Sequence, residues 1–215
     1  MSALYAEIST ALQAGKQKIV AELVEKAIVE KLPAQEILDK GLLSGMDIIG
    51  EKFKNNDVYV PEVLVAARAM NTGAALLKPL LAESGAKAVG KVAIGTVKGD
   101  LHDIGKNLVK LMLEVKGLEV VDLGVDVTAE KFLEAYKEHK VDAVALSALL
   151  TTTMQEMKTV IEMFKEAGVR DEVIIMVGGA PISESFKDSI GADIYTPDAA
   201  SAADACKAAI LKKSA

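Results

Sequence analysis

The segment at positions 99–105, Gly-Asp-Leu-His-Asp-Ile-Gly, places one of only two histidines between two aspartates, directly after an apolar run. Neutral imidazole is the commonest protein ligand for transition metals. A carboxylate that accepts a hydrogen bond from the other ring nitrogen fixes the tautomer and raises the basicity of the ligand. The pattern therefore predicts that His102 is a metal ligand supported by Asp100, with no cysteine cluster beside it.

The composition limits which partners such a site can serve. The chain has 215 residues, of which 51% are hydrophobic and 26% charged, which is typical of a globular protein with one large domain or two small ones. A net charge of −6 and 4% aromatic residues argue against a nucleic-acid surface, which needs clustered Lys and Arg or stacking platforms. No run approaches the ~18 apolar residues of a membrane span, so neither nucleic acid nor membrane is an expected partner.

The cellular location is expected to be the cytoplasm. The first residues carry no basic segment followed by a long apolar run, so we predict no secretory signal. The single Cys206 can form no internal disulfide, which fits a reducing compartment.

The first 88 residues have apolar positions at helical spacing and almost no strand signal. The apolar stripes cover residues 4–12, 19–28, 37–53 and 63–81. The second stripe ends near Leu32 and Pro33, and the fourth begins at Pro61, a favoured first position of a helix. Short connections between them predict a four-helix bundle over residues 1–88.

From residue 89 to residue 215, short β-rich runs alternate with helical stretches. The predicted strands lie near residues 91–96, 119–123, 143–147, 173–177 and 194–196. The predicted helices lie near residues 104–115, 129–139, 153–167, 183–189 and 199–211. Regular alternation of this kind predicts an α/β domain with a doubly wound parallel sheet and helices on both faces.

Three loops of this second domain follow predicted strands and are expected to meet at one ligand, because ligands bind outside the carboxyl ends of parallel strands. They are residues 99–105, 147–153 and 178–180. A hydroxyl of the second loop is expected to bond Asp100 and complete a relay from hydroxyl to carboxylate to imidazole. The paired Gly178 and Gly179 are expected to let a bulky group approach the backbone and to begin the next helix.

At these residues the sequence resembles the cobalamin-binding domain family, whose motif is DxHxxG, then SxL, then GG. The corresponding residues are 100–105, 147–149 and 178–179, and the gaps between them resemble the spacing usual in the family. The segments 59–63 and 67–70 resemble the helical cap that precedes this domain in methionine synthase and in small corrinoid methyl-carrier proteins. The resemblance covers nearly the whole chain and implies a flavodoxin-like, Rossmann-type sheet of five strands behind the bundle.

The resemblance implies a cofactor, cobalamin or a related corrinoid cycling between methyl-Co(III) and Co(I), whose own base is replaced on cobalt by His102. Asp100 would hold the imidazole, and Thr153 would take the position where methionine synthase has a serine. Other matched residues would contact the nucleotide tail or, in the bundle, the methyl-bearing face. The candidate cofactor-binding residues are Gly99, Asp100, Leu101, His102, Asp103, Ile104, Gly105, Ser147, Leu149, Thr151, Thr153, Gly178, Gly179, Ala180, Ala199, Tyr59 and Met70.

The function implied by the resemblance is that of a non-catalytic corrinoid subunit in one-carbon metabolism. It would accept a methyl group on cobalt from a donor methyltransferase and deliver it to an acceptor methyltransferase, with a reductive activation protein as a third partner. The donor would be methanol, a methylamine, a methoxylated aromatic or a betaine. The cap would swing aside about residues 82–91, and Asp100 with Thr153 would tune methylation against demethylation. The alternatives are a cobalamin-dependent sensor or regulator and the small subunit of a carbon-skeleton mutase.

Simpler structural interpretations remain for several of these residues. A lone histidine at the end of a strand is commonly a packing residue, although the three motifs in register favour the ligand for His102. The run Thr151-Thr152-Thr153 would be only a helix N-terminus, since threonine is a good cap, and Asp103 would only stabilise the start of the following helix. Met46 and Met70 would belong to the core of the bundle. His139, at a predicted helix end, is given no role.

Overall fold

The computed structural model describes residues 3–83 and 89–214. The chain divides into two compact units, Met1–Lys87 and Ala88–Ala215, and each unit is described by itself. The predicted boundary at residue 88 and the middle of the predicted hinge at residues 82–91 lie outside the described residues. No helix of the described ranges is both long enough and apolar enough to span a membrane.

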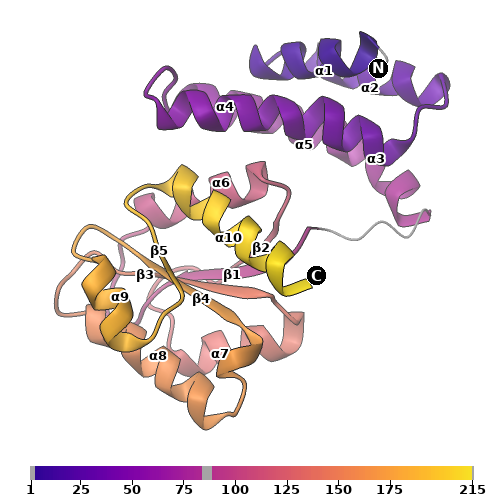
Figure 1. Ribbon diagram of the computed structural model, residues 1–215. Helices are drawn as coiled ribbons and strands as arrows, with labels where there is room; N and C mark the ends of the chain where they lie inside the picture. The colour runs from indigo at the N-terminus through magenta and orange to yellow at the C-terminus, as the bar shows by residue number, and fades with distance from the viewer. Residues whose placement is uncertain (1–2, 84–88, 215) are drawn as a thin grey trace. The chain divides into compact units, whose positions relative to one another are not determined.

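The first unit is built from four helical segments, as the apolar stripes predict (Figure 1). They are α1 (Ala3–Gln13), α2 (Gln17–Val29), a stretch that runs from α3 (Ala34–Glu36) through η1 (Ile37–Leu43) into α4 (Ser44–Lys54), and α5 (Val60–Glu83). Their apolar faces meet in a core that includes the fully buried Ile8, Leu12, Leu42, Met46 and Leu77. This is the predicted bundle.

The third segment differs from a regular α-helix in its middle, which apolar periodicity does not reveal. Residues Ile37–Leu43 form a π-helix, a rare form that widens the turn by one residue. Helix α1 packs closely here. A Cβ added at Gly41 would lie 3.1 Å from Ile8 Cγ2, and one at Gly45 would lie 3.1 Å from the Ser9 carbonyl oxygen. The two glycines therefore allow the backbones of α1 and this segment to approach each other.

The second unit contains a sheet of five parallel strands in the order β2-β1-β3-β4-β5. The strands are β1 (Lys91–Thr96), β2 (Glu119–Asp122), β3 (Ala143–Ser147), β4 (Ile174–Gly178) and β5 (Ile194–Tyr195). This is the flavodoxin-like order, in which the chain reverses direction across the sheet between β1 and β3 and leaves a crevice at their carboxyl ends. Thr96, Ser147 and Gly178 occupy the same register across β1, β3 and β4.

Helices cover both faces of this sheet, as predicted. On one face lie α6 (Ile104–Val115) and α10 (Ala199–Ser214), and on the other lie α7 (Ala129–His139), α8 (Met154–Glu166) and α9 (Glu184–Ile190) (Figure 1). A short 3₁₀ turn, η2 (Arg170–Glu172), precedes β4. The core under α7 and α8 includes Phe132, Val144, Phe164 and Ile175.

The predicted elements are all present, with ends that differ from the predictions by up to three residues. One local prediction is wrong. Gly178 and Gly179 do not begin the following helix, because α9 begins at Glu184 and its N-cap is Ser183, whose hydroxyl accepts a hydrogen bond from the Phe186 N–H. Gly178 is instead the last residue of β4, and Gly179 is the first residue after that strand.

Candidate functional site

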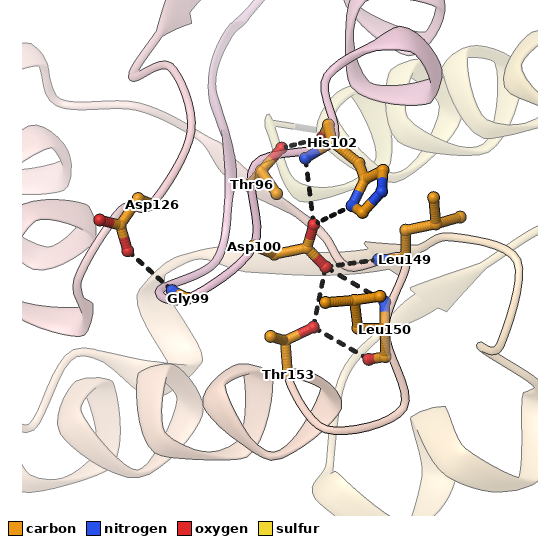
Figure 2. Close-up of polar contacts among 8 residues, drawn as sticks. All are labelled: Thr96, Gly99, Asp100, His102, Asp126, Leu149, Leu150 and Thr153. Atoms are coloured by element: carbon orange, nitrogen blue, oxygen red, sulfur yellow. Dashed lines mark hydrogen bonds and ion pairs between the residues drawn. The ribbon is translucent and has the colours of Figure 1, made fainter.

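The loops after β1 and β3 meet at the side chain of Asp100 (Figure 2). This point lies at the carboxyl ends of β1 and β3, where the strand order reverses. Asp100 is completely buried. Its Oδ1 accepts from the His102 backbone N–H at 3.1 Å and lies 2.7 Å from His102 Nδ1. Its Oδ2 accepts from the backbone N–H groups of Leu149, at 2.8 Å, and Leu150, at 3.2 Å, and from the Thr153 hydroxyl, at 2.8 Å. One carboxylate thus joins the two loops.

The charge state of Asp100 follows from these contacts. Burial raises the pKa of this carboxyl, but the hydrogen bonds donated by His102, Leu149 and Thr153 outweigh burial and hold the pKa well below its ordinary value. Asp100 is therefore ionised and can only accept hydrogen bonds. The opposing Nδ1 of His102 must carry the proton of the ring, and in the neutral imidazole this leaves Nε2 as the nitrogen with a lone pair.

His102 combines a fixed backbone with an exposed ring. The Thr96 hydroxyl, fully buried at the end of β1, donates to the His102 carbonyl oxygen at 2.8 Å. The side chain of His102 remains 51% exposed. A half-exposed ring that is held at Nδ1 and keeps a lone pair on Nε2 is suited to bind a metal ion presented from outside the loop. In the described parts of the chain, no group of three or more His, Cys, Asp or Glu side chains gathers into a metal site.

Thr153 lies at the N-cap position of α8, yet its hydroxyl does not cap that helix. The hydroxyl lies 2.8 Å from Asp100 Oδ2 and 2.9 Å from the Leu150 carbonyl oxygen, so its single proton is shared between these two acceptors. The predicted chain from hydroxyl to carboxylate to imidazole is therefore present, and the N-cap interpretation of Thr153 does not describe its contacts.

The glycines of the site have different surroundings. Gly179 has a φ of +136°, and a Cβ added there would collide with the carbonyl oxygen of Ala148. Gly105 and Gly178 have no heavy atom within 4 Å of an added Cβ. The packing of the protein explains the glycine at position 179, whereas positions 105 and 178 have open space in front of them.

Large apolar side chains are exposed around His102. Ile104 is 85% exposed and Leu101 is 71% exposed, and Leu149 and Leu150 beside Asp100 are also exposed. Single exposed apolar residues are ordinary, but a group of them around one imidazole is typical of a surface that a ligand or partner covers.

The remaining predicted residues lie in varied places. Asp103 is the N-cap residue of α6, and its Oδ2 accepts from the Asn107 side chain at 3.1 Å. Thr151 and Ala180 are exposed in the loops after β3 and β4, and Ala199 is buried as the first residue of α10.

The two predicted cap residues belong to the other unit, which is described by itself. Tyr59 is exposed just before α5. Met70 is buried, which favours the core interpretation for this methionine.

Sequence reasoning missed a fourth loop at this edge, the one after β2. Asp126 in that loop accepts a hydrogen bond from the Gly99 N–H at 2.7 Å (Figure 2). The strand order was the missing information, because β2 lies beside β1 only in the folded sheet. The sequence contained one signal for this contact: the loop carries an aspartate, a residue type that tolerates positive φ and is common in tight turns. Backbone donors such as the Leu150 N–H have no signature in a sequence.

Comparison with known proteins agrees with this geometry. Two family models, each described as a B12 binding domain, match residues 90–207 and residues 4–78. The chain is 43% identical to trimethylamine corrinoid protein 1 of Methanosarcina acetivorans over 91% of each chain, and 46% identical to the dimethylamine corrinoid protein of Methanosarcina barkeri over 93% of each. It matches the crystal structure of the methanol:cobalamin methyltransferase complex MtaBC from M. barkeri with a TM-score of 0.85 and 32% identity, covering 96% of this chain and 79% of that one. The chain therefore belongs to the family of proteins with a B12 binding domain, whose cofactor is cobalamin or a related corrinoid.

Proposed function

We propose that this protein is a methyl carrier whose corrinoid is held by His102 and which works between two methyltransferases. The observation that carries the proposal is the half-exposed imidazole of His102, which is held at Nδ1 by the buried Asp100. The names of the relatives support the methyl-carrier role, because they are corrinoid proteins of methylamine systems and a methyltransferase complex. These names lend no support to the sensor or mutase alternatives.

The residues present suit a large, flat cofactor. Leu101 and Ile104, within two residues of His102, and Leu149, whose N–H binds Asp100, have exposed apolar side chains. Gly105 and Gly178 leave open the space that a Cβ would occupy, and the protein itself gives no reason for a missing side chain there. When bound, the corrinoid supplies the cobalt on which a methyl group is carried.

Each residue of the relay has a distinct task. His102 Nε2 would hold the cobalt of the corrinoid, and Asp100 keeps the Nδ1 proton in place, which fixes the orientation of the ring and raises the donor strength of Nε2. Thr153 donates to the other oxygen of the carboxylate and so limits its movement. We place Ser147, Thr151, Gly178, Gly179, Ala180 and Ala199 along the nucleotide tail of the cofactor.

The bundle, residues 1–88 in this proposal, serves as a cap over the methyl-bearing face and moves aside for each partner. Tyr59 is the candidate for contact with that face, since it is large, aromatic and exposed. Met70 stays a weaker candidate because it is buried. The α/β domain, residues 89–215, holds the cofactor.

The proposed partners are a donor methyltransferase, an acceptor methyltransferase and a reductive activation protein. The solved relative in a methyltransferase complex supports a methyltransferase as partner. The names of the relatives favour a methylamine as the source of the methyl group.

Replacement of the proposed ligand tests this function, and the other histidine provides a matched control. His102→Ala should reduce corrinoid binding by at least about 10- to 100-fold, the loss typical when only the hydrogen-bond partner of a ligand is removed. It should also change the visible spectrum of any corrinoid that remains. His139→Ala, at the end of α7, should retain the parent spectrum. Methyl transfer is then measured with methyltransferases for mono-, di- and trimethylamine and for methanol. A His102→Ala protein with the parent spectrum and affinity would contradict the proposal.

A further inference from the structure

The loop between β2 and α7 continues the sheet beyond the end of β2. The Thr96 N–H donates to the Gly124 carbonyl at 3.0 Å, and the Val127 N–H donates to the Thr96 carbonyl at 2.9 Å. Val97 and Val127 form an isolated parallel bridge. Residues 124–127 therefore run alongside the chain that leads from β1 to the Asp100 turn.

Asp126 makes two hydrogen bonds to that turn. Its side-chain Oδ1 accepts from the Gly99 N–H at 2.7 Å (Figure 2). Its backbone N–H donates to the Asp100 carbonyl at 3.0 Å. Asp126 has a φ of +54°, the left-handed conformation that aspartate tolerates better than most residues. One residue thus binds a donor and an acceptor on consecutive residues of the turn.

The turn fixed in this way carries the carboxylate of the site. The Asp100 N–H donates to the Val97 carbonyl at 3.1 Å, and Gly99 has a φ of +78°, which matches a β-turn of type II over residues 97–100. Within residues 97–100 the turn is closed by this one backbone hydrogen bond. A shift of the turn would move the Asp100 carboxylate relative to Leu149, Leu150 and Thr153, and His102 follows two residues later.

We propose that Asp126 is a positioning residue for His102: it clamps the Gly99–Asp100 turn and thereby fixes the orientation in which the imidazole meets cobalt. This inference rests on the proposed axial role of His102. Asp126 acts through Asp100 and does not touch the metal. Thr96 completes the frame from the other side, because its hydroxyl holds the His102 carbonyl.

Three substitutions at position 126 separate the hydrogen bond from the backbone conformation. Asp126→Asn keeps an acceptor oxygen and also tolerates positive φ. Asp126→Gly keeps the conformation but removes the acceptor, and Asp126→Ala removes the acceptor and strains the conformation. Gly168 also has a positive φ, of +74°, and has open space in front of it, so Gly168→Ala adds strain without removing a contact and is the control for strain alone.

The measurements use the full chain with and without cobalamin. With cobalamin in the Co(II) state, electron paramagnetic resonance reports the axial nitrogen through its hyperfine splitting, and a spectrophotometric titration gives the affinity. Without cobalamin, hydrogen exchange at the Gly99 amide reports the clamp. We expect Asp126→Asn to resemble the parent. We expect Asp126→Gly and Asp126→Ala to show faster exchange at Gly99, broadened or mixed axial signals and about tenfold weaker binding.

The outcomes distinguish this inference from the function on which it rests. If Asp126→Gly keeps the parent signal and affinity, the clamp is not needed and the inference is wrong. The inference is equally wrong if Gly168→Ala changes the signal as much as Asp126→Ala does. If His102→Ala itself keeps the parent signal, the axial assignment fails, whatever the variants of Asp126 show.

Discussion

Gly178 and Gly179 are neighbours that lack a side chain for different physical reasons. At Gly179 a Cβ would overlap the Ala148 carbonyl oxygen, and the φ of +136° is one that L-residues rarely adopt. At Gly178 nothing in the protein lies within 4 Å of an added Cβ. Gly179 is therefore required by the fold, and the space at Gly178 is available to the ligand.

This difference leads to opposite predictions for two alanine variants. Gly179→Ala should lower the free energy of unfolding of the cofactor-free protein by about 2–4 kcal/mol, since strain and overlap act together. Gly178→Ala should unfold at the parent denaturant concentration and yet bind cobalamin at least several-fold more weakly. Urea unfolding without cofactor and a spectrophotometric titration with cobalamin separate the two effects.

The outcome for Gly178 is the informative one. If Gly178→Ala binds cobalamin as the parent does, the open space at this position does not receive the cofactor. Gly168→Ala offers a comparison, because Gly168 also faces open space but lies in the turn after α8, away from Asp100; its φ of +74° adds a small strain of its own.

At the scale of elements, α6 is held on the edge strand β2 by a cluster of charges. The Nζ of Lys106, which is almost fully buried, lies 2.6 Å from Asp122 Oδ1, and the Nζ of Lys110 lies 3.1 Å from Asp122 Oδ2. The Gly124 N–H also donates to Asp122 Oδ1 at 3.0 Å. The cluster thus links the helix that follows His102 to the loop that contains Asp126.

This cluster predicts a pH dependence of stability. Burial raises the pKa of Asp122, but the hydrogen bonds from Lys106, Gly124 and Lys110 outweigh it and lower the pKa to about 2. A lowered pKa in the folded state contributes stability that is complete above the ordinary value near 3.8 and is lost as the pH falls towards 2. The contribution at neutral pH is about 2 kcal/mol. Asp122→Asn should therefore lose stability at pH 7 and show a flatter decline between pH 4 and pH 2.

The measurement is urea unfolding of the parent protein and of Asp122→Asn at several pH values. Glu114 also faces the cluster. Burial and the charge of Asp122 raise its pKa, so it titrates above Asp122 and contributes in the opposite direction. Glu119→Gln, which breaks the more exposed pair with Lys91, is the control and should change stability by less than about 1 kcal/mol. If the free energy of unfolding falls equally steeply below pH 4 in the parent and in Asp122→Asn, Asp122 is not the group responsible for the loss of stability.

At the scale of the whole molecule, the proposed role of the bundle as a cap is open to a direct test through a single introduced thiol. The only cysteine, Cys206, is fully buried in α10, and burial, together with the charge of Asp142, raises the pKa of its thiol to about 12. A thiol of this kind reacts slowly with labels. A cysteine introduced on the surface of the bundle can therefore be labelled selectively.

We expect a fluorophore on Tyr59→Cys to be strongly quenched when cobalamin binds, because corrinoids absorb visible light and the proposed cap places this residue near the ring. A fluorophore on Val29→Cys, at the exposed end of α2, should be quenched less. Steady-state fluorescence during a cobalamin titration provides the measurement. Equal quenching at both positions would contradict the assignment of Tyr59 to the face that covers the cofactor.

Much of the site could be predicted because its chemistry is encoded in adjacent residues. Asp100 and His102 are two positions apart, and Thr153 follows a strand whose apolar run is easily recognised. The hydrogen bond between Thr153 and Asp100 follows once both strands are placed at neighbouring positions in a parallel sheet. Residue type and local periodicity were sufficient for these predictions.

The rest depended on contacts between segments far apart in the sequence. The N–H donors of Leu149 and Leu150 belong to the backbone, which every residue shares, so no residue type marks them. The burial of Met70 depended on which side of α5 faces the core, and the amphipathic pattern alone did not decide between core and cap.

The sequence by itself determined the order of elements, the helical and α/β halves, and the identities of the imidazole and its carboxylate, because periodicity and motif spacing are local properties. Only the tertiary structure decided that β2 lies beside β1, that the loop after β2 reaches Gly99 through Asp126, and that Gly179 is fixed by the Ala148 carbonyl while Gly178 faces open space. The physical reason is that hydrogen bonds and steric limits act over a few ångströms in space, and folding alone brings these distant residues within that range.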